Sequence, residues 1–258
     1  DTYGKGVHSK MLCVACHTGI TSVPAAGAGH TGEAPGALAS ASCADCHTKL
    51  WDQAKADQTA AAKPRLGVVV DNIAAYRDSF HARPGKKDPS KPLASCDGCH
   101  DTHGFNIPPE DSPSFAAWRL GVPAMCGQTC HTDSLDDYQG SIHGEKALKS
   151  HDVKSAVCSD CHTAHEISQA SAPGFMRDVI NECGRCHDST DRNGDRLGTY
   201  YKSYLESYHG QVVKLGAKRA ARCSDCHGAH DIHPLKDPNS RVAGANLVKT
   251  CAQCHPSA

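Results

Sequence analysis

The sequence has few of the residues that fill a conventional protein core. Leu, Ile, Val and Phe together make up 38 of the 258 residues, or 15%, and a share below about 20% is typical of chains that cannot build a packed apolar interior. A single-core enzyme of this length is therefore not expected. Disorder is not expected either, because it usually combines low hydrophobicity with a high net charge, and the formal net charge is only -1.

Further absences restrict the partners of the chain. No stretch of about 18 apolar residues is present, so no transmembrane segment is expected. Lys and Arg number 27 against 28 Asp and Glu and form no basic block, which predicts no binding to nucleic acid. The first residues, Asp1–Lys5, lack the apolar stretch of a secretory signal. We interpret them as the start of a mature chain, or of a chain that lacks its signal.

The sequence is instead rich in Cys and His, with 16 and 18 copies, and every cysteine falls into one pattern. Seven copies read Cys-x-x-Cys-His, and an eighth, from Cys126 to His131, contains one extra residue. This pattern is the attachment signature of c-type haem. The predicted thioether residues are Cys13, Cys16, Cys43, Cys46, Cys96, Cys99, Cys126, Cys130, Cys158, Cys161, Cys183, Cys186, Cys223, Cys226, Cys251 and Cys254. The predicted proximal iron ligands are His17, His47, His100, His131, His162, His187, His227 and His255. The cofactors expected are thus eight covalently bound haem c groups.

Two other uses of cysteine remain open as alternatives. Structural zinc takes four ligands from paired Cys-x-x-Cys half-sites, but it does not require a histidine directly after each second cysteine. A disulfide framework is typical of small secreted domains, but it would not select the following residue either. For the copy from Cys126 to His131, the alternative is a degraded site without haem.

Ten histidines lie outside the motifs, and only three Met could replace them as iron ligands. Eight of the ten alternate with the motifs in the order histidine, motif, histidine, motif, repeated four times. We predict that these eight bind the irons from the distal side, so that each iron has two histidine ligands. They are His8, His30, His81, His103, His143, His165, His209 and His230. His151 and His233 fall outside the order and are interpreted as surface histidines, which is also the alternative for each predicted distal ligand.

The same order predicts four repeats with two haems each, within one continuous haem-cored body rather than independent domains. Repeats 1 to 4 cover residues 1–60, 61–133, 134–195 and 196–258. The first free histidine of a repeat follows a Tyr by five residues, as His81 follows Tyr76, and in repeats 2 to 4 the second lies three residues after a proximal histidine, as His103 follows His100. Three residues cannot carry the chain around a haem. We therefore expect the second histidine to bind a neighbouring haem, most simply that of the following motif.

The expected fold class is mainly loop with short α-helices and little or no β-structure. The predicted helices cover residues 69–80, a segment starting at 134, and residues 173–186 and 197–215. In the last of these, Tyr200, Tyr204 and Tyr208 share one face and are predicted to pack against porphyrin. The segment Asp191–Asp195 resembles part of a calcium loop, although an Asn-Gly turn is the preferred interpretation.

The motifs, together with the passages Cys158–Ile167 and Cys223–Ile232, resemble the octahaem members of the multihaem c-type cytochromes of anaerobic and metal-respiring microbes. The resemblance covers nearly the whole chain. It implies an exported electron carrier, extracellular or at the cell surface, or alternatively periplasmic. Some members are similar to subunits of extracellular cytochrome filaments, in which haems stack end to end.

Three functions follow as hypotheses. The first is electron transfer by hopping along eight bis-histidine haems, as the subunit of a conductive extracellular homopolymer in which His8 could bind a haem of a neighbouring subunit. The second is a discrete periplasmic carrier or conduit subunit that exchanges electrons with other redox proteins. The third is a reductase of nitrite, hydroxylamine or a sulfur oxyanion. An iron with two histidine ligands has no open position for a substrate, so an enzyme is not expected.

Overall fold

The computed structural model describes residues 2–18, 42–188 and 197–256. Within these ranges the chain is mainly helical with connecting loops and contains no β-strand, only one isolated bridge between Pro84 and Pro92. The expectation of short helices and little β-structure is confirmed to this extent. No helix in the described ranges combines the length and the apolar character needed to cross a membrane.

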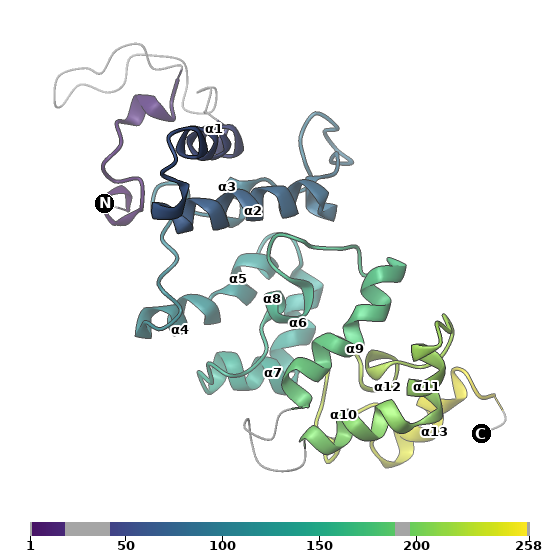
Figure 1. Cartoon of the computed structure of the whole chain (residues 1–258). Helices are drawn as coiled ribbons and strands as arrows, with labels where there is room; N and C mark the ends of the chain where they lie inside the picture. The colour runs from purple at the N-terminus through teal and green to yellow at the C-terminus, as the bar shows by residue number, and fades with distance from the viewer. Residues whose placement is uncertain (1, 19–41, 189–196, 257–258) are drawn as a thin grey trace. The chain divides into compact units, whose positions relative to one another are not determined.

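The chain divides into two compact units. The first contains Asp1–Asn106 and the short segment His165–Ile167, and the second contains Ile107–Ala164 and Ser168–Ala258. The helices of the first unit are α1 (Cys43–Ala56), α2 (Pro64–Asp78) and α3 (Cys96–Cys99), with 3₁₀ turns at Tyr3–Lys5, Cys13–Ala15, Ala60–Ala62 and Phe80–Ala82. Helices α1 and α2 pack against each other (Figure 1). The four predicted repeats are a division of the sequence and stay a prediction.

The second unit is built from ten α-helices within its described residues. They are α4 (Pro113–Leu120), α5 (Val122–Gly127), α6 (Thr132–Gly140), α7 (Ile142–Gly144), α8 (Cys158–His162), α9 (Pro173–His187), α10 (Leu197–Glu206), α11 (Tyr208–Lys214), α12 (Cys223–His227) and α13 (Gly244–Ala252), with a π-turn at Glu145–Lys149 after α7. Helix α9 packs against both α8 and α10 (Figure 1).

The ends of the helices follow from particular residues. Helix α2 begins with a proline, whose missing N–H is not needed in the first turn. Helix α9 confirms the helix predicted over 173–186. The single helix predicted over 197–215 is wrong, because Ser207 adopts an extended conformation with ψ of 160° and its side chain caps a new helix, α11. A serine oxygen competes well for the free N–H groups at a helix start.

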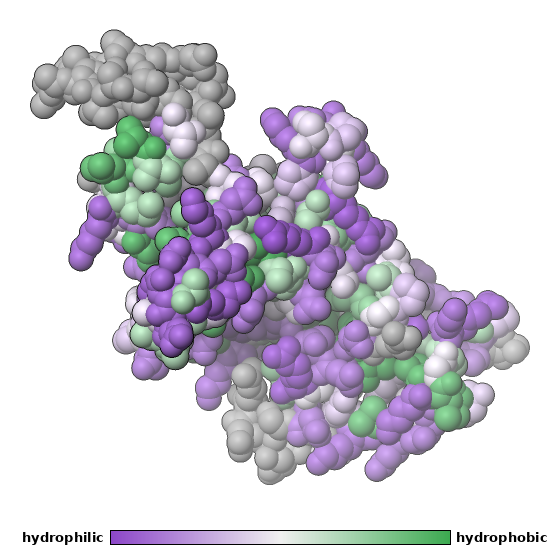
Figure 2. All heavy atoms as spheres, turned by 45° about the horizontal axis from the view of Figure 1, so that its top comes forward, coloured by the Kyte–Doolittle hydropathy of each residue, from purple (hydrophilic) through white to green (hydrophobic). Residues whose placement is uncertain are grey.

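Little of the interior is aliphatic. The buried hydrophobic side chains are Ala54, Val122, Tyr138, Ala147, Val157 and Ile180. Four of these, Val122, Tyr138, Ala147 and Val157, form a single cluster in the second unit. Large apolar side chains such as Leu12 and Leu215 are 75% and 87% exposed, and Figure 2 shows hydrophobic areas scattered over the surface. The scarcity of core residues in the sequence therefore appears in the structure as a small core.

Candidate haem-binding sites

Six pairs of imidazole rings lie at nearly the same distance from each other. The distances between ring centroids are 5.9 Å for His8–His47, 6.0 Å for His17–His103, 6.0 Å for His100–His165, 6.1 Å for His143–His187, 6.0 Å for His162–His230 and 6.0 Å for His209–His255. Other ring pairs among the described residues range more widely, from 4.6 Å for His100–Phe105 to 6.4 Å for Tyr3–His103.

This distance is close to the one that a shared metal atom requires. A bond from an imidazole nitrogen to a metal is about 2.0–2.1 Å long. The nitrogen of a five-membered ring lies about 1.2 Å from the ring centre, so two imidazoles on opposite sides of one metal have centroids about 6.4 Å apart. The six observed distances, between 5.9 and 6.1 Å, fall slightly below this value. The paired residues therefore fit an iron with two histidine ligands.

Each pair joins one histidine that follows a cysteine motif with one histidine from the set of predicted distal ligands. In repeats 1, 3 and 4 the first free histidine lies opposite the second motif of the same repeat, as His143 faces His187. The second free histidine lies opposite the first motif of the preceding repeat, as His103 faces His17. The expectation that His103, His165 and His230 face the following motif is therefore wrong. His8, offered as a ligand for a neighbouring subunit, faces His47 of its own chain.

The other predicted iron ligands are His30, His81, His131 and His227. His81 belongs to the first compact unit, and His131 belongs to the second. His227 ends α12 and has no imidazole opposite it among the described residues. His30 lies outside the described residues.

The two histidines left over by the sequence order have other surroundings. His151 is exposed and adopts a positive φ of 51°. The Nδ1 atom of His233 lies 3.3 Å from a carboxylate oxygen of Asp237. Neither faces another imidazole in the described ranges, as expected for histidines outside the repeat order.

Burial keeps several paired histidines neutral. It lowers the pKa of His143 to about 4, with a further contribution from the nearby His187. Burial also lowers the pKa of His47, His100 and His162. Neutral imidazole is the form that binds metal ions, so the electrostatic environment suits ligation. The buried Nδ1 of His17 has no hydrogen-bond partner in the described part of the chain.

Each motif forms a tight turn that places its cysteines and its histidine together. In the motifs at Cys13, Cys96 and Cys251, the histidine N–H donates to the carbonyl of the first cysteine, at 2.9, 2.8 and 2.9 Å. In the longer motif, His131 N–H makes the same bond to Cys126 at 3.2 Å. The extra residue is thus accommodated in a wider turn, in which the histidine is still hydrogen-bonded to the first cysteine.

Successive motifs approach each other through their first cysteines. The thiols of Cys43 and Cys96, of Cys126 and Cys158, and of Cys183 and Cys223 lie close enough to shift each other's pKa. Each contact links the second motif of one repeat with the first motif of the next. All sixteen cysteines are free, and none forms a disulfide.

A repeated serine turn presents the free histidines. The side chains of Ser79, Ser141 and Ser207 each lie two residues before a predicted distal ligand and accept a hydrogen bond from the backbone N–H that follows this ligand, at 3.3, 3.0 and 3.2 Å. This bond closes one turn of helix around the histidine. Because the backbone is fixed on both sides, the imidazole has a defined direction.

A tyrosine ties each of these turns to the next cysteine motif. The hydroxyl groups of Tyr76, Tyr138 and Tyr204 donate to the carbonyls of Ala94, Ala156 and Ala221, at 2.7, 2.8 and 3.0 Å. Tyr3 makes the corresponding bond to Met11. Every acceptor stands two residues before the first cysteine of a motif. The spacing of tyrosine and histidine is visible in the sequence, but the role of the hydroxyl is not.

The tyrosines predicted to pack against porphyrin differ in their surroundings. Tyr204 is held by its hydroxyl, and burial raises its pKa to about 12. Tyr200 and Tyr208 are 61% and 79% exposed. Their packing against porphyrin stays a prediction.

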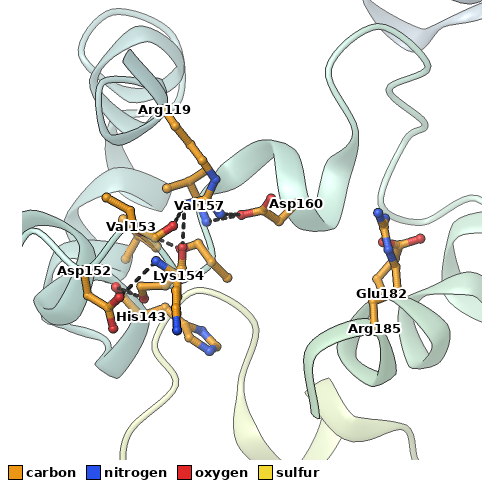
Figure 3. A network of polar contacts seen from close by, with 12 residues as sticks. Arg119, His143, Asp152, Val153, Lys154, Val157, Asp160, Glu182 and Arg185 are labelled. Atoms are coloured by element: carbon orange, nitrogen blue, oxygen red, sulfur yellow. Dashed lines mark hydrogen bonds and ion pairs between the residues drawn. The ribbon is translucent and has the colours of Figure 1, made fainter. Parts of the chain in front are cut away.

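Arg119 anchors the loop that leads into the motif at Cys158 (Figure 3). Its guanidinium donates to the carbonyls of Val153 and Ser155, at 2.8 and 2.9 Å, and pairs with Asp160 inside the motif. Asp160 in turn accepts from Val157 N–H at 2.7 Å. The motif at Cys223 repeats part of this arrangement, because Asp225 accepts from Arg222 N–H at 2.8 Å.

The described residues contain no cluster of three or more His, Cys, Asp or Glu that could hold a metal ion. An iron with two histidine ligands does not need such a cluster, because only two side chains bind it. The possible calcium loop at Asp191–Asp195 lies outside the described residues.

Comparison with known proteins adds no assignment. No protein family, no curated protein and no solved structure was found to match this chain.

Proposed function

We propose that the chain is a multihaem c-type cytochrome that transfers electrons by hopping along eight closely spaced bis-histidine haems. The observation that carries the proposal is the set of six imidazole pairs, each with one histidine from a cysteine motif and with centroids 5.9–6.1 Å apart. A bound haem supplies one-electron chemistry at its iron. The two thiols of each motif would hold the group covalently, and two histidines would bind its iron.

The proposal favours conduction over catalysis. Where two histidines take both axial positions, no position remains for a substrate. The serine turns and the tyrosine hydroxyls hold the distal histidines in place from two different segments of the chain, so that the ligands resist displacement. Burial adds to this by keeping imidazoles such as His143 neutral and ready to bind.

The spacing of the motifs supports transfer between haems. In three pairs of cysteines from successive motifs, the thiols are close enough to shift each other's pKa, so the groups attached to them would begin near each other. The proximal histidines of neighbouring motifs are also close enough to affect each other, since His131 lowers the pKa of His162 and His227 lowers that of His187. Short separations of this kind favour hopping from one centre to the next.

The proposal includes an exported protein, extracellular or alternatively periplasmic, that passes electrons to other redox proteins or acceptors. We favour a homopolymer, because the sequence resembles cytochromes that include the subunits of extracellular filaments. A discrete carrier remains the competing form of the same function.

Intact-mass measurement and optical spectra of the purified holoprotein test the proposal together. The expected mass is that of the polypeptide plus eight haem groups, and the expected spectrum is low-spin in both oxidation states. An unmodified polypeptide mass, or a mainly high-spin spectrum, would contradict it. Stepwise reductive titration should then show several overlapping one-electron transitions.

A further inference from the structure

We infer that Arg119 is a positioning residue that fixes two neighbouring haem sites at once, the site of the motif at Cys158 and the site between His143 and His187. The inference rests on the proposed function, because it assigns a part in electron transfer to a residue outside the motifs. Arg119 stands in α4, 41 residues before its partner Asp160. All the contacts that carry the inference lie within the second compact unit.

The guanidinium of Arg119 holds both the motif and the loop before it (Figure 3). Its Nη1 donates to the carbonyls of Val153 and Ser155, at 2.8 and 2.9 Å, and its Nη2 pairs with a carboxylate oxygen of Asp160. The rigid, planar fork of donors lets one side chain make these contacts together. Only 17% of the Arg119 side chain is exposed, and a partly buried ion pair is screened much less by salt than an exposed one. Arg119 is therefore an anchor within the unit rather than a member of a surface ion pair.

The first site that this anchor reaches is the motif at Cys158. Asp160 stands between the two cysteines of the motif and accepts from Val157 N–H at 2.7 Å as well as from Arg119. These two bonds hold the first turn of α8, which carries both cysteines and ends at His162. The imidazole of His162 faces a predicted distal ligand at 6.0 Å. Arg119 thus acts on this site through one carboxylate.

The second site is reached through Ser155. This residue, whose carbonyl accepts from Arg119, donates its hydroxyl to the carbonyl of His143 at 2.8 Å. Ser155 is only 6% exposed, so water does not compete readily for the bond. The imidazole of His143 faces that of His187 at 6.1 Å. One side chain therefore links the distal ligand of one iron with the cysteine motif of another.

The motif at Cys223 has the same five residues as the motif at Cys158 and a different arginine beside it. Asp225 accepts from Arg222 N–H at 2.8 Å, but the guanidinium of Arg222 lies 3.8 Å from this carboxylate, which is 45% exposed. The same guanidinium donates to the carbonyl of Lys218, four residues earlier, so its contacts stay within one loop. The anchor from a distant helix is therefore a feature of the fold around Cys158 and not of the motif itself.

The anchor has two separable consequences for the haems. Its hydrogen bonds fix the directions of the imidazoles of His143 and His162, on which the low-spin resonance signal of each haem depends. Its charge offsets that of Asp160, and an unpaired carboxylate beside a haem favours the oxidised iron and lowers the reduction potential. Arg119 therefore acts on ligand orientation at both sites and on the potential of the haem at Cys158.

The first test compares three variants of the purified holoprotein by electron paramagnetic resonance. Arg119→Met removes all three contacts, and we expect the low-spin signals of two of the eight haems to shift. Asp160→Asn removes only the ion pair in the motif, and Ser155→Ala removes only the bond to His143. Each of these two should shift the signal of one haem, and the two haems should differ. Arg65→Met is the matched control, because Arg65 is exposed in α2, and it should shift no signal.

The second test measures reduction potentials by spectroelectrochemical titration. Arg119→Met should shift one of the eight steps to lower potential, and Asp160→Asn should shift the same step to higher potential. Arg119→Lys keeps the charge but not the fork of donors, so we expect shifted resonance signals with a potential close to that of the wild type. A role in stability alone would leave the potentials of the folded holoprotein unchanged.

Each outcome separates the inference from the function it rests on. An Arg119→Met holoprotein with unchanged signals and potentials would overturn the inference while leaving eight haems in place, and so would a shift at one haem only. If this variant does not accumulate, Asp160→Asn and Ser155→Ala decide, because the inference requires that they affect two different haems. An unmodified mass of the wild-type polypeptide would instead overturn the proposed function.

Discussion

The turns around His143 and His209 have the same local structure and different surroundings. In both, a serine hydroxyl donates to the carbonyl of the preceding tyrosine, Tyr138 or Tyr204, at 2.7 Å. In both, the tyrosine hydroxyl reaches a carbonyl before the next motif. Ser141 is buried and Ile142 is half-buried in the turn at His143, whereas the corresponding Ser207 is half-buried and Tyr208 is 79% exposed in the turn at His209. Local hydrogen bonds therefore set the shape of the turn, and tertiary contacts decide its burial.

The largest expected effect on stability comes from the glycines that follow His143 and His209. A Cβ atom at Gly144 would lie 1.8 Å from the carbonyl oxygen of Tyr138, and one at Gly210 would lie 2.1 Å from that of Tyr204. Neither backbone can give way cheaply. We expect Gly144→Ala and Gly210→Ala each to reduce the free energy of unfolding by about 3 kcal/mol, the upper end for overpacking. Chemical unfolding of the holoprotein followed by circular dichroism measures this.

Gly140→Ala is the control for both glycine variants, because no heavy atom lies within 4 Å of its added Cβ. Its effect should stay within about 1 kcal/mol, as for an ordinary helical glycine. Equal, small effects of all three substitutions would show that the turn is more adaptable than its contacts suggest.

The next largest effect separates the two turns. Tyr138→Phe removes the donor to the Ala156 carbonyl in a buried setting, where an unsatisfied group costs about 1–3 kcal/mol. Tyr204→Phe removes the same bond in a turn more accessible to water, and we expect a loss of about 1 kcal/mol or less. The difference in unfolding midpoint between the two variants measures how much burial amplifies one hydrogen bond. A larger loss for Tyr204→Phe would reverse the comparison.

The serine caps should differ less. Ser141→Ala and Ser207→Ala each remove an acceptor for the N–H that follows the histidine, at 3.0 and 3.2 Å. Loss of such a cap costs about 1 kcal/mol. We also expect a broader low-spin resonance from the haem of the affected histidine, because its imidazole is less well oriented. Unchanged spectra in both variants would show that the cap acts on stability alone.

The smallest effect on the single chain is expected at Tyr208. Its side chain is exposed, so Tyr208→Ala should change the unfolding free energy of dilute protein by no more than about 0.5 kcal/mol. The same substitution should weaken the proposed self-assembly, if this exposed aromatic side chain lies in the contact surface. Light scattering of concentrated protein measures this. If Tyr208→Ala leaves the degree of assembly unchanged, the contact surface does not include Tyr208.

The sequence was informative where a short motif repeats. The motif pattern, the alternation of free histidines, the scarcity of core residues and the short helices could all be read from residues close together in the chain. The break at Ser207 was missed because the tyrosine spacing continues across it. The structure shows that Ser207 leaves the helical conformation and that its side chain caps the next helix. The hydroxyl bonds of Tyr76 and Tyr138 span 18 residues, beyond the reach of a periodicity argument.

The amino-acid sequence alone determined which groups can hold a cofactor, because cysteine and histidine chemistry depends on residue type and on spacing within one turn. The tertiary structure decided which histidine faces which. His103 lies three residues from His100 and yet faces His17, more than eighty residues earlier. The reason is geometric. Two imidazoles that share an iron must lie on opposite sides of it, and His103 reaches this position opposite His17 only because one repeat folds against the previous one.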